Sequence, residues 1–259
     1  MNPVNGHNAE PAGYGETALD INSRRTLWII FVFCVAIVVM LFFLDYKVNW
    51  HESSSRKSIR SMFDTTAEHS IAGWFSATLT FVVAMAAWAN VVLVRTIDSP
   101  AWRRAGWLVI ALLFTYLSLD DGAAIHEHLG GGLKKTAVVG DVIGAYSSYS
   151  WHIVILPFFV AMGFFMLIFL WKELAHRNER TGILAAFSFF ALAIGQDYIE
   201  GTIEEYDWFQ ATYGMDPYAI LHFAKSLEEC LEMLGMTLFL VVFLSHLMRT
   251  YRTLTLRFQ

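Results

Sequence analysis

Acidic and histidine side chains gather inside hydrophobic stretches of this 259-residue chain. A charged group near the centre of a bilayer costs at least about 2.5 to 3.5 kcal/mol, so such groups usually mark a functional site. The clusters lie near residues 120, 200 and 228 and comprise Asp120, Asp121, His126, Glu127, Asp197, Glu200, Glu204, His222, Glu228, Glu229 and Glu232.

The charges in these clusters do not balance. Nine carboxylates face one basic residue inside the same stretches, Lys225. Carboxylates this close either take up protons or bind cations. Carboxylate and imidazole groups together are typical ligands of iron, zinc and manganese, and helical bundles build such sites from several helices. The pattern therefore predicts a divalent transition metal held by Asp120, Asp121, His126, Glu127, Glu200, Glu228, Glu229 and Glu232.

The elements that must position these groups are membrane helices. Hydrophobic residues make up 56% of the chain and charged residues 16%, and the mean hydropathy is +0.47, which excludes an ordinary soluble domain. Six stretches have the length of about 20 apolar residues that a span needs. They are residues 27–46, 71–94, 105–129, 151–171, 183–206 and 219–247.

These stretches predict an all-α fold, a polytopic membrane protein with a six-helix transmembrane bundle over residues 23–249. Residues 1–22 are polar and rich in Gly and Asn, so they predict a disordered N-terminal tail, and residues 250–259 predict a short basic C-terminal tail. Eleven basic residues flank the spans on the side of both termini and six on the other side. The positive-inside rule then predicts cytoplasmic termini, in a multi-pass protein of the bacterial inner membrane.

This orientation puts the acidic clusters at one level. Spans that run outward carry their carboxylates in the last third, and spans that run inward carry theirs in the first half. At a rise of 1.5 Å per residue, all of these groups fall in the outer, periplasmic part of the membrane. Helical spacing also places Asp197, Glu200 and Glu204 on one face of their span. The sequence thus predicts an intramembrane site near the periplasmic side.

The amino-acid composition limits the classes of molecule that this protein can bind. The net charge of -5 and the lack of a long Lys/Arg run argue against nucleic acid. Membrane lipids are the expected surroundings, and a homo-oligomer or a larger membrane complex is compatible with the sequence. The two cysteines, Cys34 and Cys230, both lie in apolar runs and cannot form a disulfide framework.

Three functions fit this pattern. One is a metal-dependent enzyme acting on a lipid or other hydrophobic substrate, the second a proton- or cation-coupled transporter or channel, and the third an accessory subunit of a membrane complex. The one-sided placement of the carboxylates favours the enzyme, since a transporter needs polar groups across the membrane. A structural network remains an alternative at 228–232, in which Lys225 pairs with Glu229 one turn away.

Three motifs resemble a family of bacterial six-span membrane proteins without an established function. They are Phe63-x4-Glu68 with Trp74-Phe75-Ser76, Leu117-Ser-Leu-Asp-Asp-x4-His126-Glu127, and Leu227-Glu-Glu-x-Leu-Glu-Met-Leu-Gly235. The resemblance covers about residues 60 to 245, with Asp121 where the family has Glu and Cys230 where it has Gly. It implies no reaction. The resemblance implies only that the following residues belong together: Glu68, Asp120, Asp121, His126, Glu127, Glu228, Glu229 and Glu232.

Overall fold

The described part of the chain is helical. The computed structural model describes residues 22–123, 125, 150–200, 210–214 and 216–250. The helices are α1 (Ser23–Leu44), the π-helix η1 (Asp45–Trp50), α2 (Lys57–Phe63), α3 (Ile71–Thr96), α4 (Ala101–Ala123), α7 (Ser150–Glu173), α8 (Arg177–Glu200) and α10 (Pro217–Thr250). The predicted tails, 1–21 and 251–259, and most of the segment between α4 and α7 lie outside the described residues.

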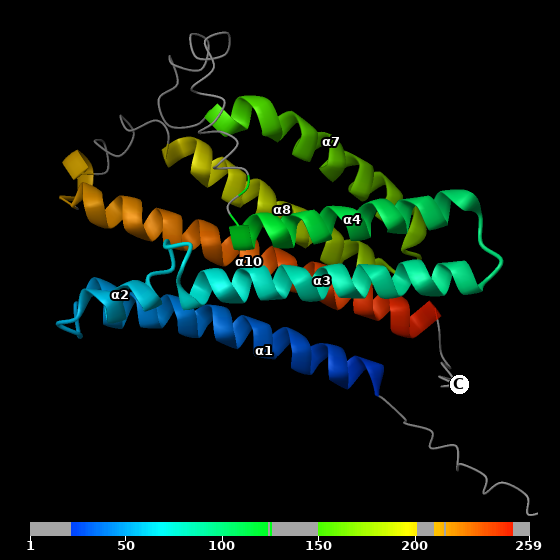
Figure 1. Cartoon of the computed structure of the whole chain (residues 1–259), viewed down its shortest axis with the longest axis horizontal. Coiled ribbons are helices and arrows are strands. Elements are labelled where there is room, and N and C mark those ends of the chain that lie inside the picture. The colour runs from blue at the N-terminus through cyan, green and yellow to red at the C-terminus, as the bar shows by residue number, and fades with distance from the viewer. Residues whose placement is uncertain (1–21, 124, 126–149, 201–209, 215, 251–259) are drawn as a thin grey trace, which may run out of the picture.

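Successive long helices run in opposite directions, so the bundle has two distinct ends (Figure 1). One end holds η1, α2 and the beginning of α10, and we call it the acidic end, after Asp45, Asp64 and Asp120. The other end holds the α3–α4 and α7–α8 turns, and we call it the basic end, after Arg103 and Arg249. The beginning of α1 and the end of α10 both lie at the basic end.

Membrane-like composition explains why these segments are helical. Backbone groups in hydrocarbon must pair within their own segment, and an α-helix achieves this. Four helical stretches are long and apolar enough to cross a membrane, a finding that covers the described residues only. They are Ser23–Trp50, Ile71–Thr96, Ala101–Ala123 and Tyr218–Thr250. An all-helical protein with candidate membrane spans is therefore confirmed, while six spans and their orientation stay predictions.

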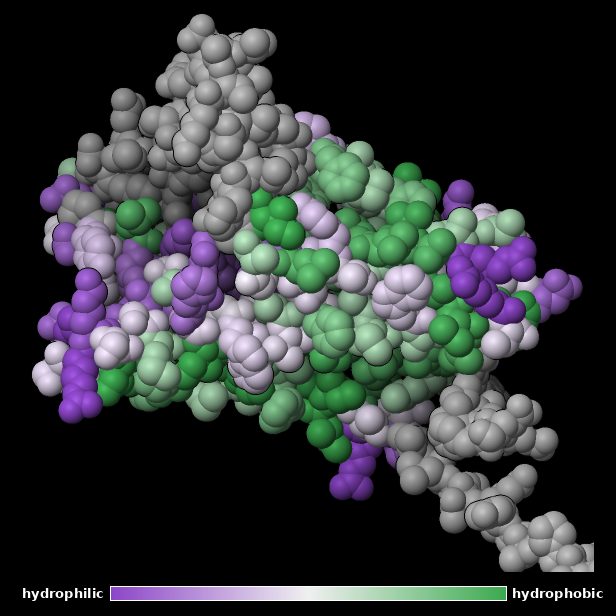
Figure 2. All heavy atoms as spheres, in the orientation of Figure 1, coloured by the Kyte–Doolittle hydropathy of each residue, from purple (hydrophilic) through white to green (hydrophobic). Residues whose placement is uncertain are grey.

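The core lies between the two ends and is built from large apolar side chains. Trp107, Phe114, Phe243 and Leu170 are fully buried, as is Val83 of α3. Aromatic rings of α4 meet those of α10 edge-on, with 5.2 Å between the Phe114 and Phe239 centroids. Figure 2 shows the same division on the surface, with apolar residues across the middle and hydrophilic ones toward the ends. The apolar middle fits a bilayer core.

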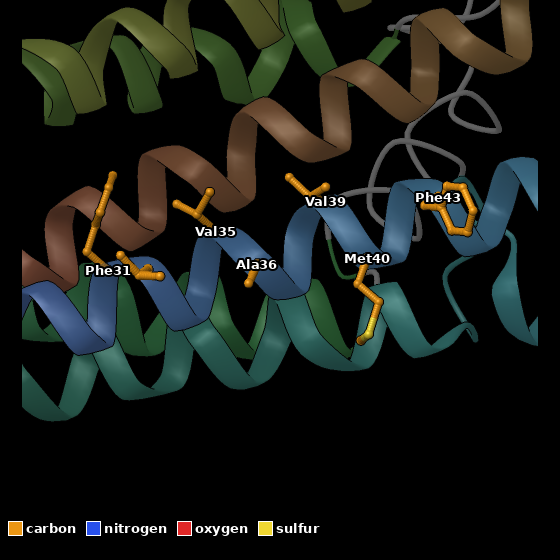
Figure 3. Close-up of a pocket in the computed structure, with 7 residues that line it drawn as sticks. Phe31, Val35, Ala36, Val39, Met40 and Phe43 are labelled. Atoms are coloured by element: carbon orange, nitrogen blue, oxygen red, sulfur yellow. The ribbon is translucent and has the colours of Figure 1, made fainter.

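Among the four candidate spans of the described residues, the one that begins with α1 is the least buried. Its inner stripe, Cys34, Val38 and Leu41, is buried, and α1 packs on α10. Its outer side forms an open apolar groove (Figure 3), where Val39 and Phe43 are more than half exposed. Such a surface suits contact with lipid chains.

Candidate metal centre

A buried carboxylate, Asp45, lies at the centre of the polar cluster at the acidic end. It continues the buried stripe of α1 by one helical step and is the first residue of η1. Its Oδ2 atom lies 2.9 Å from His222 Nε2 and accepts a hydrogen bond from the Ser226 hydroxyl at 3.0 Å. The Thr65 hydroxyl lies 3.1 Å from the same oxygen, and the Asn49 amide donates to Oδ1 at 2.9 Å.

A second carboxylate, Asp64, adjoins Asp45 from the segment after α2. The backbone N–H of Thr66 donates to its Oδ1 at 3.0 Å and the Thr66 hydroxyl at 2.7 Å, an arrangement that fixes the turn. One ligand atom each from Asp45, Asp64 and His222 lie within 4.8 Å of one another. Three separate elements, η1, the segment after α2 and α10, therefore converge on one point.

An aromatic stack fixes the histidine of this trio. The Trp50 ring lies nearly parallel to the His222 ring, with 5.2 Å between centroids and 21° between planes. Tyr218 stacks on Trp50 in turn, at 5.7 Å. Because Asp45 and Trp50 are the first and last residues of η1, the π-helix positions both groups that define the orientation of His222.

The donor set fits a divalent transition metal. Two carboxylates and one imidazole are ligands that zinc, iron and manganese accept. Ligands about 2.0 to 2.2 Å from a tetrahedral ion lie roughly 3.3 to 3.6 Å apart, and the ligand atoms of this trio lie within 4.8 Å of one another. An ion held here would take the place of the proton between His222 and Asp45, and the hydroxyls of Ser226 and Thr65 would orient the Asp45 carboxylate.

The structure places most of the predicted ligands at the same end. Asp120 is buried on α4, and Asp121 is exposed and accepts a hydrogen bond from the Thr80 hydroxyl at 2.9 Å. Glu228, Glu229 and Glu232 are half-buried on α10. Among the described residues, these five do not form a trio with metal spacing.

The remaining predicted ligands are not described. His126 and Glu127 lie outside the described residues, and Glu200 ends α8 with its side chain outside them. The predicted eight-residue site therefore stays a prediction. On α10, Glu229 lies 20° to 60° in helical phase from His222 and Ser226, so the two sets share a helix face.

One expectation from the sequence needs correction, and two residues of the site were left out of it. Lys225 is exposed and forms no ion pair with another described residue, so the predicted Lys225–Glu229 pair is absent from this part of the chain. The sequence interpretation also omitted Asp45 and Asp64. Asp45 falls inside the predicted span 27–46, so the rule that intramembrane charges mark function already pointed to it. Asp64 carries no comparable signal.

The basic end holds a second buried carboxylate, Glu173, at the end of α7. Arg103 of α4 donates to both of its oxygens, with Nε at 2.9 and 2.7 Å. Trp107 Nε1 donates at 3.3 Å, and His246 Nε2 lies 3.3 Å away. Burial raises the pKa of Glu173, but hydrogen bonds with His246, Arg103 and Trp107 and the Arg103 charge outweigh it, and the pKa is about 2.

A family model described as a domain of unknown function (DUF8692) matches residues 26–247. The chain belongs to this family. The match includes the range in which the sequence resembles an uncharacterised family, and both clusters lie within it. No curated protein and no solved structure matches the chain. The DUF8692 family thus supplies membership and no reaction, and functional inference depends on the geometry.

Proposed function

We propose that this DUF8692 protein is a six-span protein of the bacterial inner membrane that binds a divalent transition metal at its acidic end. Asp45, Asp64 and His222 are the proposed ligands. The observation that carries the proposal is the spacing of their ligand atoms, which lie within 4.8 Å of one another although the residues come from three elements. Iron, zinc and manganese are the candidate ions.

Burial and charge support a cation at this place. The side chains of Asp45 and His222 are 1% and 7% exposed. A buried carboxylate such as Asp45, with the half-buried Asp64 beside it and no permanent cation, is stabilised by a proton or a metal ion. Asp45 meets a histidine, two hydroxyls and an amide, and none of these donors carries a fixed charge.

The one-sided position supports an enzyme over a transporter. Between the two ends, the described core consists of apolar groups such as Val83, Phe114 and Phe239. Two buried polar residues at this depth bond to backbone oxygens: Asn90 to Ala86 and Phe243, and Thr237 to Met233. We propose a metal-dependent enzyme with a lipid or other hydrophobic substrate, in which the ion would supply a Lewis acid or a redox centre.

Metal-dependent stabilisation tests the ligand assignment. Protein stripped with a chelator should gain thermal stability when zinc, manganese or iron is added, by about 2.7 kcal/mol at a hundredfold excess over Kd. His222→Gln should lose this gain, whereas His246→Gln, a matched histidine at the basic end, should keep it. A wild-type protein that no ion stabilises, or a His222→Gln variant that responds fully, would refute the assignment.

Reporter fusions test the proposed orientation. Both termini in the cytoplasm require that a reporter at Gln259 or near Asn178 reads cytoplasmic and one near Tyr213 periplasmic. A periplasmic C-terminus would move the acidic end to the cytoplasmic side. That result would overturn the orientation and leave the metal assignment standing.

A further inference from the structure

Helices α4 and α7 approach closely at the basic end. Gly106 of α4 packs against the Phe169 ring, which occupies the place of a Cβ atom on this glycine. Trp102 and Trp107 also meet Phe169 edge-on, each with 5.8 Å between centroids. Together with the Arg103–Glu173 pair, these contacts fix the end of α7 on the beginning of α4.

Toward the acidic end the same two helices diverge (Figure 1). A cavity of about 300 Å³ lies between them, lined by Val109, Leu112, Leu113 and Tyr116 of α4 and by Phe158 and Met162 of α7. We call it the α4–α7 groove. Leu112 and Phe158 are about half exposed, at 52% and 51%, so the groove opens at the surface of the bundle.

Beyond the apolar lining, α4 becomes polar. Tyr116 is the last residue of α4 that lines the groove, and the buried Asp120 follows one helical turn later. A hydrocarbon groove that ends at a hydroxyl and a carboxylate matches the shape of an amphiphile, with its chain in the groove and its polar head at the acidic end. Asp120 is itself one of the residues that the sequence predicts as metal ligands.

We infer that the α4–α7 groove binds the acyl chain of a membrane lipid and presents its headgroup to the acidic end. This inference rests on the proposed function, since it specifies the hydrophobic substrate as a lipid. The groove lies midway along a helix that can cross a membrane, where the surrounding molecules are lipid chains.

A phospholipid with a photoactivatable group in its acyl chain tests the groove. The full-length protein is reconstituted in vesicles that contain this lipid, illuminated and digested, and the labelled residues are located by mass spectrometry. We expect label concentrated on Leu112, Leu113 and Met162. Leu112→Trp, which fills the mouth of the groove, should reduce this label severalfold, while Leu192→Trp on the exposed side of α8 should not.

Three outcomes would overturn the inference. Label spread equally over the groove and the exposed face of α1 would indicate general contact with the bilayer. Unchanged labelling in Leu112→Trp would place the chain elsewhere. A dimer that Leu112→Trp dissociates would make a second copy the occupant. Because labelling needs no metal, loss of the metal proposal would leave this result interpretable, and the reverse also holds.

Discussion

The two ends of α10 carry similar clusters of a histidine, a carboxylate and a tryptophan, which differ in one charged residue. Near each end a buried histidine meets a buried carboxylate, His222 with Asp45 and His246 with Glu173. A tryptophan stacks on each histidine, at 5.2 Å for Trp50 and 5.4 Å for Trp107. At the basic end, Arg103 adds a permanent positive charge.

At the acidic end, a second carboxylate, Asp64, takes the place of the arginine. The bidentate guanidinium of Arg103 neutralises Glu173 and holds α4 against α7, which is a structural role. The acidic end has no comparable fixed cation among the described groups around Asp45. At the basic end the chain supplies the cation of this carboxylate–histidine–tryptophan arrangement itself, and we propose that at the acidic end a metal ion supplies it.

Removal of the arginine should give the largest effect on stability. Arg103→Met leaves Glu173 buried without its permanent counter-charge, and breaking such a pair costs about 3 to 5 kcal/mol of unfolding free energy. Thermal unfolding in detergent measures the loss. The pair of the exposed Glu52 with the half-buried Arg60 serves as control, and Glu52→Gln should cost less than about 1 kcal/mol. Equal losses of unfolding free energy in both variants would mean that the Arg103–Glu173 pair does not stabilise the bundle.

The pH dependence of stability should also originate at the basic end. The pKa of Glu173 is lowered from 4.5 to about 2, so its contribution is complete at neutral pH and declines as the pH falls through this range. Between about pH 6 and about pH 3, wild type should lose about 2 kcal/mol more than Glu173→Gln. Unfolding of both proteins at the two pH values measures this difference. Parallel losses would contradict the lowered pKa.

Two glycines of α4 should respond in opposite directions. Gly106→Ala places a methyl group into the Phe169 ring at the tight basic end, and such overpacking costs about 1 to 3 kcal/mol. Gly122→Ala, near the acidic end, meets no atom of the described residues within 4 Å and should stabilise the helix by up to about 1 kcal/mol. The melting temperatures of the two variants provide the measurement. A shift of the same sign in both would show that α4 and α7 are not tightest at the basic end.

The helices could be predicted from the sequence because hydrocarbon leaves the backbone few alternatives. The predicted stretch 71–94 corresponds to α3 (Ile71–Thr96), and 151–171 corresponds to α7 (Ser150–Glu173). The prediction of the first span was less accurate at its C-terminal boundary. Hydropathy predicts its last residue at 46, whereas the helix continues as η1 to Trp50, because the π-turn is stabilised by contacts of Trp50 with His222 and Tyr218.

The sequence predicts at which end of the bundle the candidate site lies, but only some of the residues that form it. Helical phase and topology place the carboxylates of α4 and α10 at one end, as the structure does. The pair of Asp45 and His222 joins residues 177 positions apart, and no spacing rule connects them. Arg103 and Glu173 are likewise joined only by tertiary packing, since each alone is typical of a charged helix end.

Metal content of matched carboxylate variants tests the central comparison most directly. Wild type, Asp45→Asn and Glu173→Gln are purified without chelators from metal-replete cells, and each is assayed by elemental analysis. We expect about one equivalent of iron, zinc or manganese in wild type and in Glu173→Gln, and a loss of most of it in Asp45→Asn. Well under one equivalent in wild type, or full metal content in Asp45→Asn, would contradict a metal site at the acidic end.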